Sequence, residues 1–144
     1  MTEGRNAPRI DAAEILEGIR RWIEIESPSN DGAAVNRMVE QTEGEMRDIG
    51  VGTERTPGRA GFGDILIARS PWGGDGPGIL VLSHLDTVHP IGMLERLPFE
   101  RKGDKVYGPG IYDMKGGAYL AYYAFRHLIR EGKTTKLPIT FLFV

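Results

Sequence analysis

Two short segments of this sequence carry the side chains best suited to chemistry. In the first, the apolar run Leu80–Leu82 leads directly into Ser83-His84-Leu85-Asp86. Residues two apart in an extended chain point to the same side, so His84 and Asp86 are expected to project together from the end of a strand. Open α/β sheets place their ligands at that end of the strands. The pair predicts a metal ligand with an orienting carboxylate, or two ligands, and a plain polar turn is the simpler alternative.

The second segment is glycine-rich and precedes a helical pattern. Residues 108–117 read GPGIYDMKGG. A phosphate-binding loop is disfavoured, because Asp113 takes the place of the third glycine in G-x-G-x-x-G and the Gly-Lys-Ser/Thr of a P-loop is missing. Two interpretations remain: a glycine-rich turn in which Asp113 is the N-cap of the next helix, or an ionised Asp113 that bridges two cations.

The composition narrows the chemistry further. The chain of 144 residues has no cysteine, which excludes thiolate nucleophiles, disulfides and sulfur ligands and leaves nitrogen and oxygen ligands for any metal. Its histidines are His84, His89 and His127, of which His89 is expected in a loop and His127 near a helix end. Lys and Arg total 18 against 20 for Asp and Glu, a balance that gives no reason to expect a nucleic-acid partner.

The sequence shows no signal for targeting or membrane insertion. The N-terminal segment Met1–Ile10 is polar and has no apolar core of the kind found in signal peptides. No apolar run reaches the roughly 18 residues that a membrane span needs. We therefore expect a soluble, cytoplasmic protein without a membrane partner.

Periodic patterns place the two segments in an α/β fold, a sheet covered by helices. Asp11 and Glu14 have the spacing of a capping box at the start of the first helix. Ile79–Leu82 is apolar on both faces, which predicts a buried inner strand. The patterns predict helices over 11–27, 31–50 and 113–132, strands over 64–68, 78–83 and 137–144, and a hairpin within 95–107.

Three features within these elements carry further expectations. Lys115 falls in the first turn of the third helix, where a lysine is most simply solvated. Trp22, Tyr119, Tyr122 and Tyr123 are expected in the core or at an interface. The sequence ends at Val144 in mid-strand with no polar tail, so we expect the front part of a longer protein.

Taken together, Ser83–Val88 and Gly108–Gly117 resemble the two N-terminal signature blocks of the M20 metallopeptidases. The Gly-Pro-Gly-Ile form of the second block is similar to the glutamate carboxypeptidase branch of that family. The resemblance implies that residues 1–144 are the N-terminal portion of a di-zinc exopeptidase-type catalytic domain. It also implies that His84 is a terminal ligand of one zinc ion, Asp113 bridges both ions, and Asp86 orients His84.

The implied site has further consequences. His84 and Asp113 should face one cleft although they lie far apart in the sequence, and the Asp113-Met114 peptide bond is expected to be cis. Nitrogen and oxygen ligands admit cobalt or manganese as well as zinc. Because a pair of metal ions can polarise a carbonyl and activate water, the resemblance implies hydrolysis of an amide bond in a small peptide or acyl-amino acid, with C-terminal glutamate as a candidate product.

The sequence also departs from the family. The glutamate pair that supplies the general base and another ligand belongs immediately after Val144, and neither it, the later ligands nor the dimerisation domain is present in these residues. We therefore expect this chain alone to be inactive. The alternative function is a non-catalytic fragment or interaction module that needs a partner chain to complete the metal site. A homodimer is a separate candidate assembly of the protein.

Overall fold

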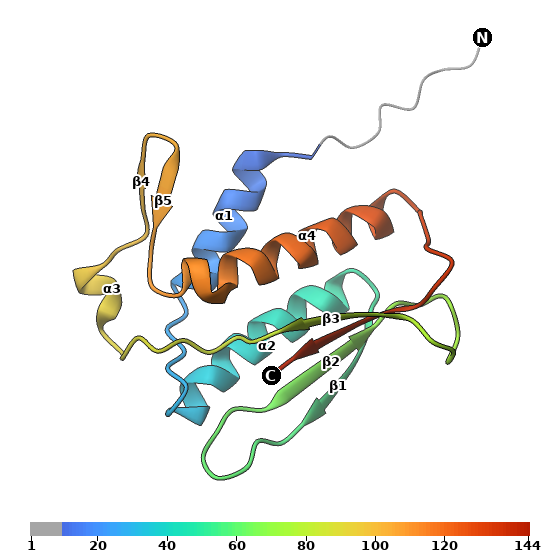
Figure 1. Cartoon of the computed structure of the whole chain (residues 1–144), viewed down its shortest axis with the longest axis horizontal. Helices are drawn as coiled ribbons and strands as arrows, with labels where there is room; N and C mark the ends of the chain where they lie inside the picture. Colours follow the sequence, from blue (N-terminus) through green and yellow to red (C-terminus); the bar gives the residue numbers. More distant parts are fainter. Residues whose placement is uncertain (1–9) are drawn as a thin grey trace.

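The computed structural model describes residues 10–144, and most of the polar N-terminal segment, residues 1–9, lies outside them. The described residues form the predicted α/β fold, with a four-stranded sheet, a separate two-stranded hairpin and helices packed on the sheet (Figure 1). The elements in chain order are α1 (Ala12–Ile23), α2 (Gly32–Asp48), β1 (Gly52–Thr56), β2 (Ile65–Arg69), β3 (Ile79–Ser83), α3 (Met93–Arg96), β4 (Glu100–Lys102), β5 (Lys105–Tyr107), α4 (Gly116–Arg130) and β6 (Ile139–Phe143).

The strand order brings distant segments together at one edge of the sheet. The order is β1-β2-β6-β3, in which β3 and β6 are parallel and the other pairs are antiparallel. A parallel pair needs a connection that returns along the sheet, and α4 makes this return between β3 and β6. The start of α4 therefore lies beside the end of β3. This is the geometry that brings Asp113 toward His84.

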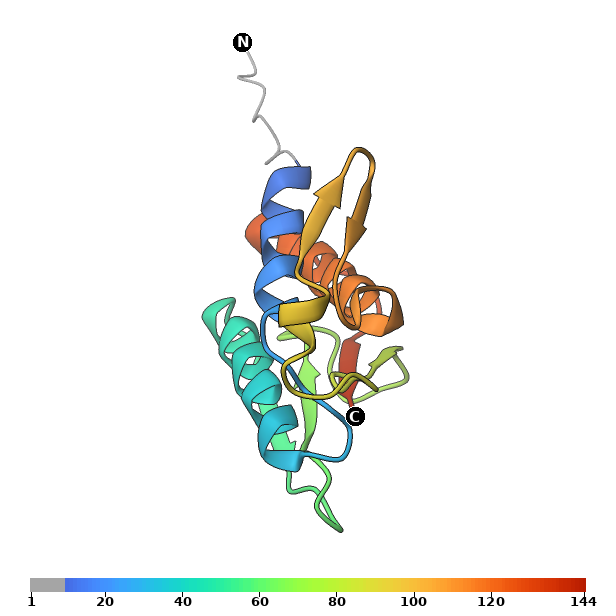
Figure 2. The same cartoon turned by 90° about the vertical axis from the view of Figure 1, so that its left-hand side faces the viewer.

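The core lies between one face of the sheet and the three long helices. On β6, Ile139, Phe141 and Phe143 are buried, whereas Thr140 and Leu142 between them are only half-buried. Figure 2 shows α1 and α2 on the same side of the sheet. The predicted core aromatics are confirmed. Trp22, Tyr119, Tyr122 and Tyr123 are all buried, and the Trp22 and Tyr119 rings meet edge to face at 5.2 Å.

The helix boundaries follow from local chemistry that the sequence predicts in large part. The Asp11 carboxylate accepts a hydrogen bond from the N–H of Ala13, and Asp31 caps α2 in the same way. The capping box at Asp11 is incomplete, because the Glu14 carboxylate does not reach back to Asp11. It accepts hydrogen bonds from Tyr123 and Arg126 at 2.8 and 2.7 Å instead. Glu14 therefore joins α1 to α4.

The prediction of a buried inner strand at Ile79–Leu82 is wrong. In the described part of the chain β3 is an edge strand that pairs with β6 alone, and Leu80 and Leu82 are 59% and 58% exposed. A strand that is apolar on both faces suits a sheet with two covering layers. Residues 10–144 place helices on one face of the sheet, so the side chains on the other face of β3 meet no covering layer.

The sequence did not predict strand β1, because its residues are polar. All five of its residues pair with β2, and Arg55 adds side-chain contacts, an Nε···Oδ2 contact of 2.6 Å to Asp64 and a distance of 3.8 Å to Glu43 on α2. The hairpin within 95–107 is confirmed as β4 and β5, which turn at Gly103 with a φ of 65°. No helix within residues 10–144 is both long enough and apolar enough to cross a membrane.

Two glycines inside helices test the packing between α1 and α4. A Cβ atom on Gly18 of α1 would lie 1.9 Å from Cζ of the buried Tyr119, whereas a Cβ on Gly44 of α2 would meet nothing within 4 Å. We predict that Gly18→Ala lowers the free energy of unfolding by about 1–3 kcal/mol, because the tyrosine must move. Gly44→Ala should raise it by about 0.5–1 kcal/mol through helix propensity. Urea denaturation measures both, and equal effects would contradict this account of the α1–α4 contact.

Candidate metal centre

The end of β3 and the turn before α4 bring together the two residues singled out by the sequence. His84 Nε2 lies 2.8 Å from Asp113 Oδ1 although 29 positions separate the residues. The predicted meeting of these side chains at the carboxyl end of the sheet is therefore confirmed. Their roles as metal ligands remain a prediction.

The imidazole of His84 is held on both ring nitrogens. Nδ1 lies 3.1 Å from both the carboxylate Oδ1 and the main-chain oxygen of Asp86, which are acceptors. Acceptors therefore face both ring nitrogens, and in the tautomer that donates from Nδ1 to Asp86, Nε2 of a neutral ring presents its lone pair to Asp113. Because a lone pair and a carboxylate repel, a proton or another cation must lie between Nε2 and Asp113. Asp86 thus has the contact expected of an orienting residue.

The electrostatics of His84 agree with this arrangement. Burial lowers the pKa of His84, but the hydrogen bond to Asp113 and the contacts with Asp86 raise it by more, so that the pKa lies above its ordinary value. The protonated ring is favoured by the same two carboxylates that would favour a bound cation. A metal ion must displace that proton, so metal binding should release it.

The turn before α4 lies very close to the loop that follows β3. Gly110 has a φ of 72°, and a Cβ on it would lie 2.3 Å from Cγ2 of Thr87, so glycine is required there. The Asp113-Met114 peptide bond is cis, as the resemblance implied. The alternative of Asp113 as an N-cap is wrong, because the residue before the first turn of α4 is Lys115 and no side chain caps this helix. The Asp113 carboxylate contacts His84 instead.

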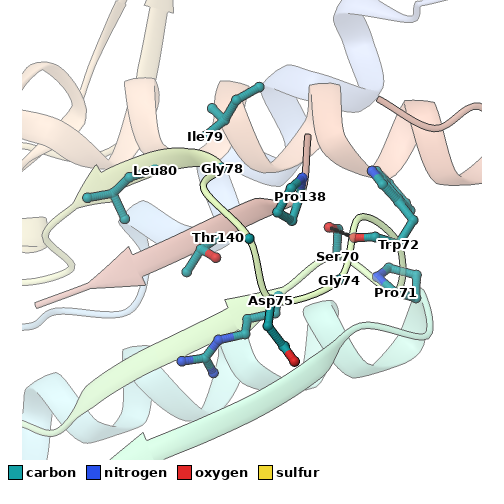
Figure 3. Close-up of a pocket in the computed structure, with 12 residues that line it drawn as sticks. Ser70, Pro71, Trp72, Gly74, Asp75, Gly78, Ile79, Leu80, Pro138 and Thr140 are labelled. Carbon is teal, nitrogen blue, oxygen red and sulfur yellow. Dashed lines mark hydrogen bonds between the residues drawn. The ribbon is translucent and has the colours of Figure 1, made fainter. Parts of the chain in front are cut away.

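A cleft of about 220 Å³ surrounds the His84–Asp113 contact. A larger hollow of about 560 Å³ lies at the opposite end of β3, and Figure 3 shows its lining around Trp72 and Pro138. The ionisable side chains that line this larger hollow are Arg69 and Asp75, and it contains no histidine, whereas the smaller cleft brings His84 together with Asp86 and Asp113. Its lining residues include Ser29, His84, Asp86, His89, Tyr112 and Asp113.

The donor set fits part of a metal site. An imidazole nitrogen and a carboxylate oxygen are ordinary ligands of zinc, cobalt and manganese, and His84 and Asp113 point theirs at one another. Among residues 10–144 no group of three or more His, Asp or Glu side chains is arranged so that it could hold a metal ion by itself. His89 lines the cleft, and His127 lies 3.5 Å from Glu131 at the far end of α4, as expected of a helix-end histidine.

The expectation of a solvated Lys115 is wrong. Its side chain is 1% exposed, and Nζ donates hydrogen bonds to the main-chain oxygens of Trp22 and Ile25 at 3.0 and 2.5 Å. Burial lowers the pKa of Lys115 to about 8, although the carboxylates of Glu26 and Asp86 raise it. The backbone is not helical at Asp113 and Met114, and Lys115 is the residue before α4 and not part of its first turn.

The segment that follows α1 is the part of the site that the sequence did not reveal. Ser27 donates from Oγ to the main-chain oxygen of Leu85 at 2.7 Å, and Thr87 N–H donates to the oxygen of Ser27 at 2.8 Å. Ser29 N–H then donates to the oxygen of Thr87 at 3.0 Å. The segment therefore runs beside the His84 loop. The sequence marked Ser27-Pro28 only as the end of a helix, and no pattern pointed to these contacts.

Comparison with known proteins places this geometry in a family. Residues 80–144, which include His84, Asp86 and Asp113, match peptidase family M20/M25/M40. Carboxypeptidase G2 from Pseudomonas sp. (strain RS-16) is 31% identical to the chain over 131 residues, which make up 90% of this chain. The chain therefore resembles the M20 family in sequence. It spans 31% of the length of Carboxypeptidase G2, about a third.

Solved structures show the same fold as this chain. Human carnosine dipeptidase 1 matches with a TM-score of 0.75 at 19% identity, over 91% of this chain and 31% of that one. The M20 family metallo-carboxypeptidase Sso-CP2 from Sulfolobus solfataricus matches with a TM-score of 0.73 at 16% identity, over 90% and 30%. The aminopeptidase PepT from Bacillus cereus ATCC 10987 has the same TM-score at 20% identity, over 92% and 36%. The α/β unit is therefore one that M20 peptidases share.

Glu26 holds the turn at Gly92–Leu94 and gives a test by pH. The N–H groups of Gly92 and Leu94 donate to its carboxylate at 2.9 and 3.0 Å and hold the pKa of Glu26 below its ordinary value. A lowered pKa in the folded state stabilises the chain above the unfolded pKa and loses this effect as the pH falls through the folded pKa. We predict that Glu26→Gln costs about 1 kcal/mol of unfolding free energy at pH 7 and less as the pH falls below about 4.

Urea denaturation from pH 7 to pH 3 measures this difference. Glu24→Gln is the control, because Glu24 pairs with Arg20 at the surface and its loss should change stability by less than about 0.5 kcal/mol. A wild-type advantage over Glu26→Gln that stays constant across the pH range would show that the Glu26 carboxylate charge has no part in holding the Gly92–Leu94 turn.

Proposed function

We propose that the protein containing this chain is a metal-dependent hydrolase of amide bonds in small peptides or acyl-amino acids. The observation that carries the proposal is the contact between His84 and Asp113 at the carboxyl end of β3, with Asp86 on the other ring nitrogen. These residues lie inside the segment that matches the M20 family. Residues 1–144 would form the N-terminal portion of the catalytic domain, in a cytoplasmic protein.

Each residue has a distinct part in the proposed site. Asp86 fixes the ring of His84 through Nδ1, so that Nε2 faces the cleft. His84 and Asp113 would hold metal, which we propose to be zinc, with cobalt or manganese as substitutes. A metal pair supplies a polarised substrate carbonyl and an activated water. His89, Ser29 and Tyr112 also line the cleft and would lie around a bound substrate.

The substrate class rests on the relatives. Carboxypeptidase G2 and the metallo-carboxypeptidase Sso-CP2 carry carboxypeptidase in their names. We therefore propose cleavage of a C-terminal residue, with glutamate as the first candidate because the Gly108–Ile111 sequence is similar to the glutamate carboxypeptidase branch. No lysine or arginine lines the cleft around His84 and Asp113. Groups that bind a substrate carboxylate would come from another part of the protein.

A second candidate function is a non-catalytic module that a partner chain completes. The observation that favours it is the pair of exposed leucines, Leu80 and Leu82, on the unpaired edge strand β3. The two functions differ in the DNA that follows the Val144 codon. A continuation that encodes a glutamate pair supports the hydrolase, and a stop codon supports the module.

Metal binding by this chain is the first test of the proposed hydrolase. Two protein ligands leave most of the coordination sphere to water, so we expect zinc to bind far more weakly than to a four-ligand site. His84→Ala and Asp113→Asn should abolish measurable binding at the cleft, and Asp86→Asn should weaken it about 10–100-fold. Isothermal titration calorimetry with zinc measures these affinities.

His127→Ala is the matched control, because it removes a histidine that pairs with Glu131 at the far end of α4. It should leave zinc affinity unchanged. Binding that survives His84→Ala at full strength, or tight stoichiometric zinc retained through dialysis of the isolated chain, would contradict the proposed two-ligand site. In parallel, hydrolysis of acyl-amino acids should appear with an extended protein and be lost in its Asp113→Asn variant.

A further inference from the structure

Three consecutive residues of the turn before α4 make contacts with two different segments, the His84 loop and the end of α1. Asp113 contacts the ring of His84, and Met114 accepts the His84 main-chain N–H on its sulfur at 3.4 Å. Lys115 turns the other way and binds the main-chain oxygens of Trp22 and Ile25. The turn is therefore anchored on both the His84 loop and the end of α1.

We propose that Lys115 is a positioning residue of the metal centre, acting through the main-chain oxygens of Trp22 and Ile25 that its ammonium group binds. This inference rests on the proposed metal-dependent function. Asp113 lies two residues before Lys115, so the position of the Lys115 ammonium restrains the Asp113 carboxylate. The same ammonium holds the segment that follows α1.

The position of the ammonium group at a helix end makes it an effective anchor. Trp22 and Ile25 lie at the end of α1, where main-chain oxygens lack helical partners and the helix dipole favours a cation. The negative carboxylates of Glu26 and Asp86 also act on Lys115. A cation therefore replaces the missing hydrogen bonds of α1 and ties this helix end to the turn that carries Asp113.

The segment after α1 transmits this anchor to His84. Ser27 binds the loop after β3 through the Leu85 oxygen and the Thr87 N–H, and Ser29 lines the cleft itself. A shift of this segment would move Leu85 and Thr87, which flank Asp86. Lys115 is thus linked to Asp113 along the chain and to the His84–Asp86 pair through hydrogen bonds.

A merely space-filling role does not require a charge at this position. Burying an ammonium group carries a large desolvation cost, and an apolar side chain of similar length would fill the same volume without that cost. The charge is useful where main-chain oxygens must be fixed. The proposal therefore predicts that the charge, and not the volume, of residue 115 controls metal binding.

The chain offers a direct way to separate charge from volume. It has no cysteine, so Lys115→Cys introduces a single thiol. Alkylation in denaturant with bromoethylamine restores an ammonium group at nearly the length of lysine, and alkylation with iodoacetamide gives a neutral side chain. Wild type taken through the same unfolding and refolding steps is the reference, and Mn²⁺ alone is the probe.

Two NMR readouts are taken on each refolded protein. Broadening of the His84 and Asp113 amide signals by Mn²⁺ gives the affinity, and amide shifts of Ser27–Ser29 without metal report the position of the segment after α1. The ammonium derivative should match wild type on both. The neutral derivative should bind Mn²⁺ at least about tenfold more weakly and show displaced Ser27–Ser29 signals. Gly18→Ala, which perturbs the α1–α4 contact elsewhere, should keep its affinity within about twofold of wild type.

The outcomes that would overturn the proposal are distinct from those that would overturn the function. Equal Mn²⁺ affinity of the neutral and ammonium derivatives contradicts the positioning role of Lys115 alone. An equal loss of affinity in Gly18→Ala, or failure of the neutral derivative to fold, shows that Lys115 acts on the fold as a whole and also overturns the proposal. Absence of Mn²⁺ broadening in wild type contradicts the proposed metal-dependent function itself.

Discussion

The imidazole of His84 lies between two carboxylates, 3.1 Å from Asp86 on one ring nitrogen and 2.8 Å from Asp113 on the other. Once Nδ1 donates its proton to Asp86, the lone pair of Nε2 faces a negative oxygen. This arrangement needs a positive charge between the two acceptors, either a proton or a metal ion. Much of the surrounding structure brings the three side chains to this geometry.

The fold brings them together by topology and holds them by main-chain contacts. The parallel pairing of β3 and β6 makes α4 begin beside the end of β3, which places Asp113 near His84. Gly110 allows the turn to approach Thr87 more closely than any side chain would permit. The buried Lys115 then connects the turn to the end of α1. The cleft is therefore supported by segments that lie far apart in the sequence.

A helix, strand or cap of this fold could be predicted where neighbouring residues in the sequence carry its pattern. The caps at Asp11 and Asp31, the helices and the apolar strands carry patterns of hydrophobicity and hydrogen bonding that a short window reveals. The polar strand β1 carries no such pattern, because it is held by pairing with β2 and by the contact of Arg55 with Asp64. The edge position of β3 was also not predicted, since the apolar residues of a strand do not determine how many layers cover it.

The residues of the candidate site also differ in whether a local sequence pattern predicts them. His84 and Asp86 could be paired from their spacing on a strand, and the two sequence blocks were distinctive enough to suggest the family. The inward turn of Lys115 and the contacts of Ser27 and Glu26 could not be predicted. They depend on where the end of α1 lies relative to the loop after β3, a distance that no local pattern encodes.

The central claim is that the space between His84 and Asp113 is made for a metal ion. Anomalous diffraction at the zinc edge, on crystals of this chain soaked in zinc, tests it most directly. The account predicts an anomalous peak bound by Nε2 of His84 and a carboxylate oxygen of Asp113, with Asp86 still on Nδ1. Zinc peaks confined to other surface groups, with His84 and Asp113 still hydrogen-bonded to each other at saturating zinc, would contradict it.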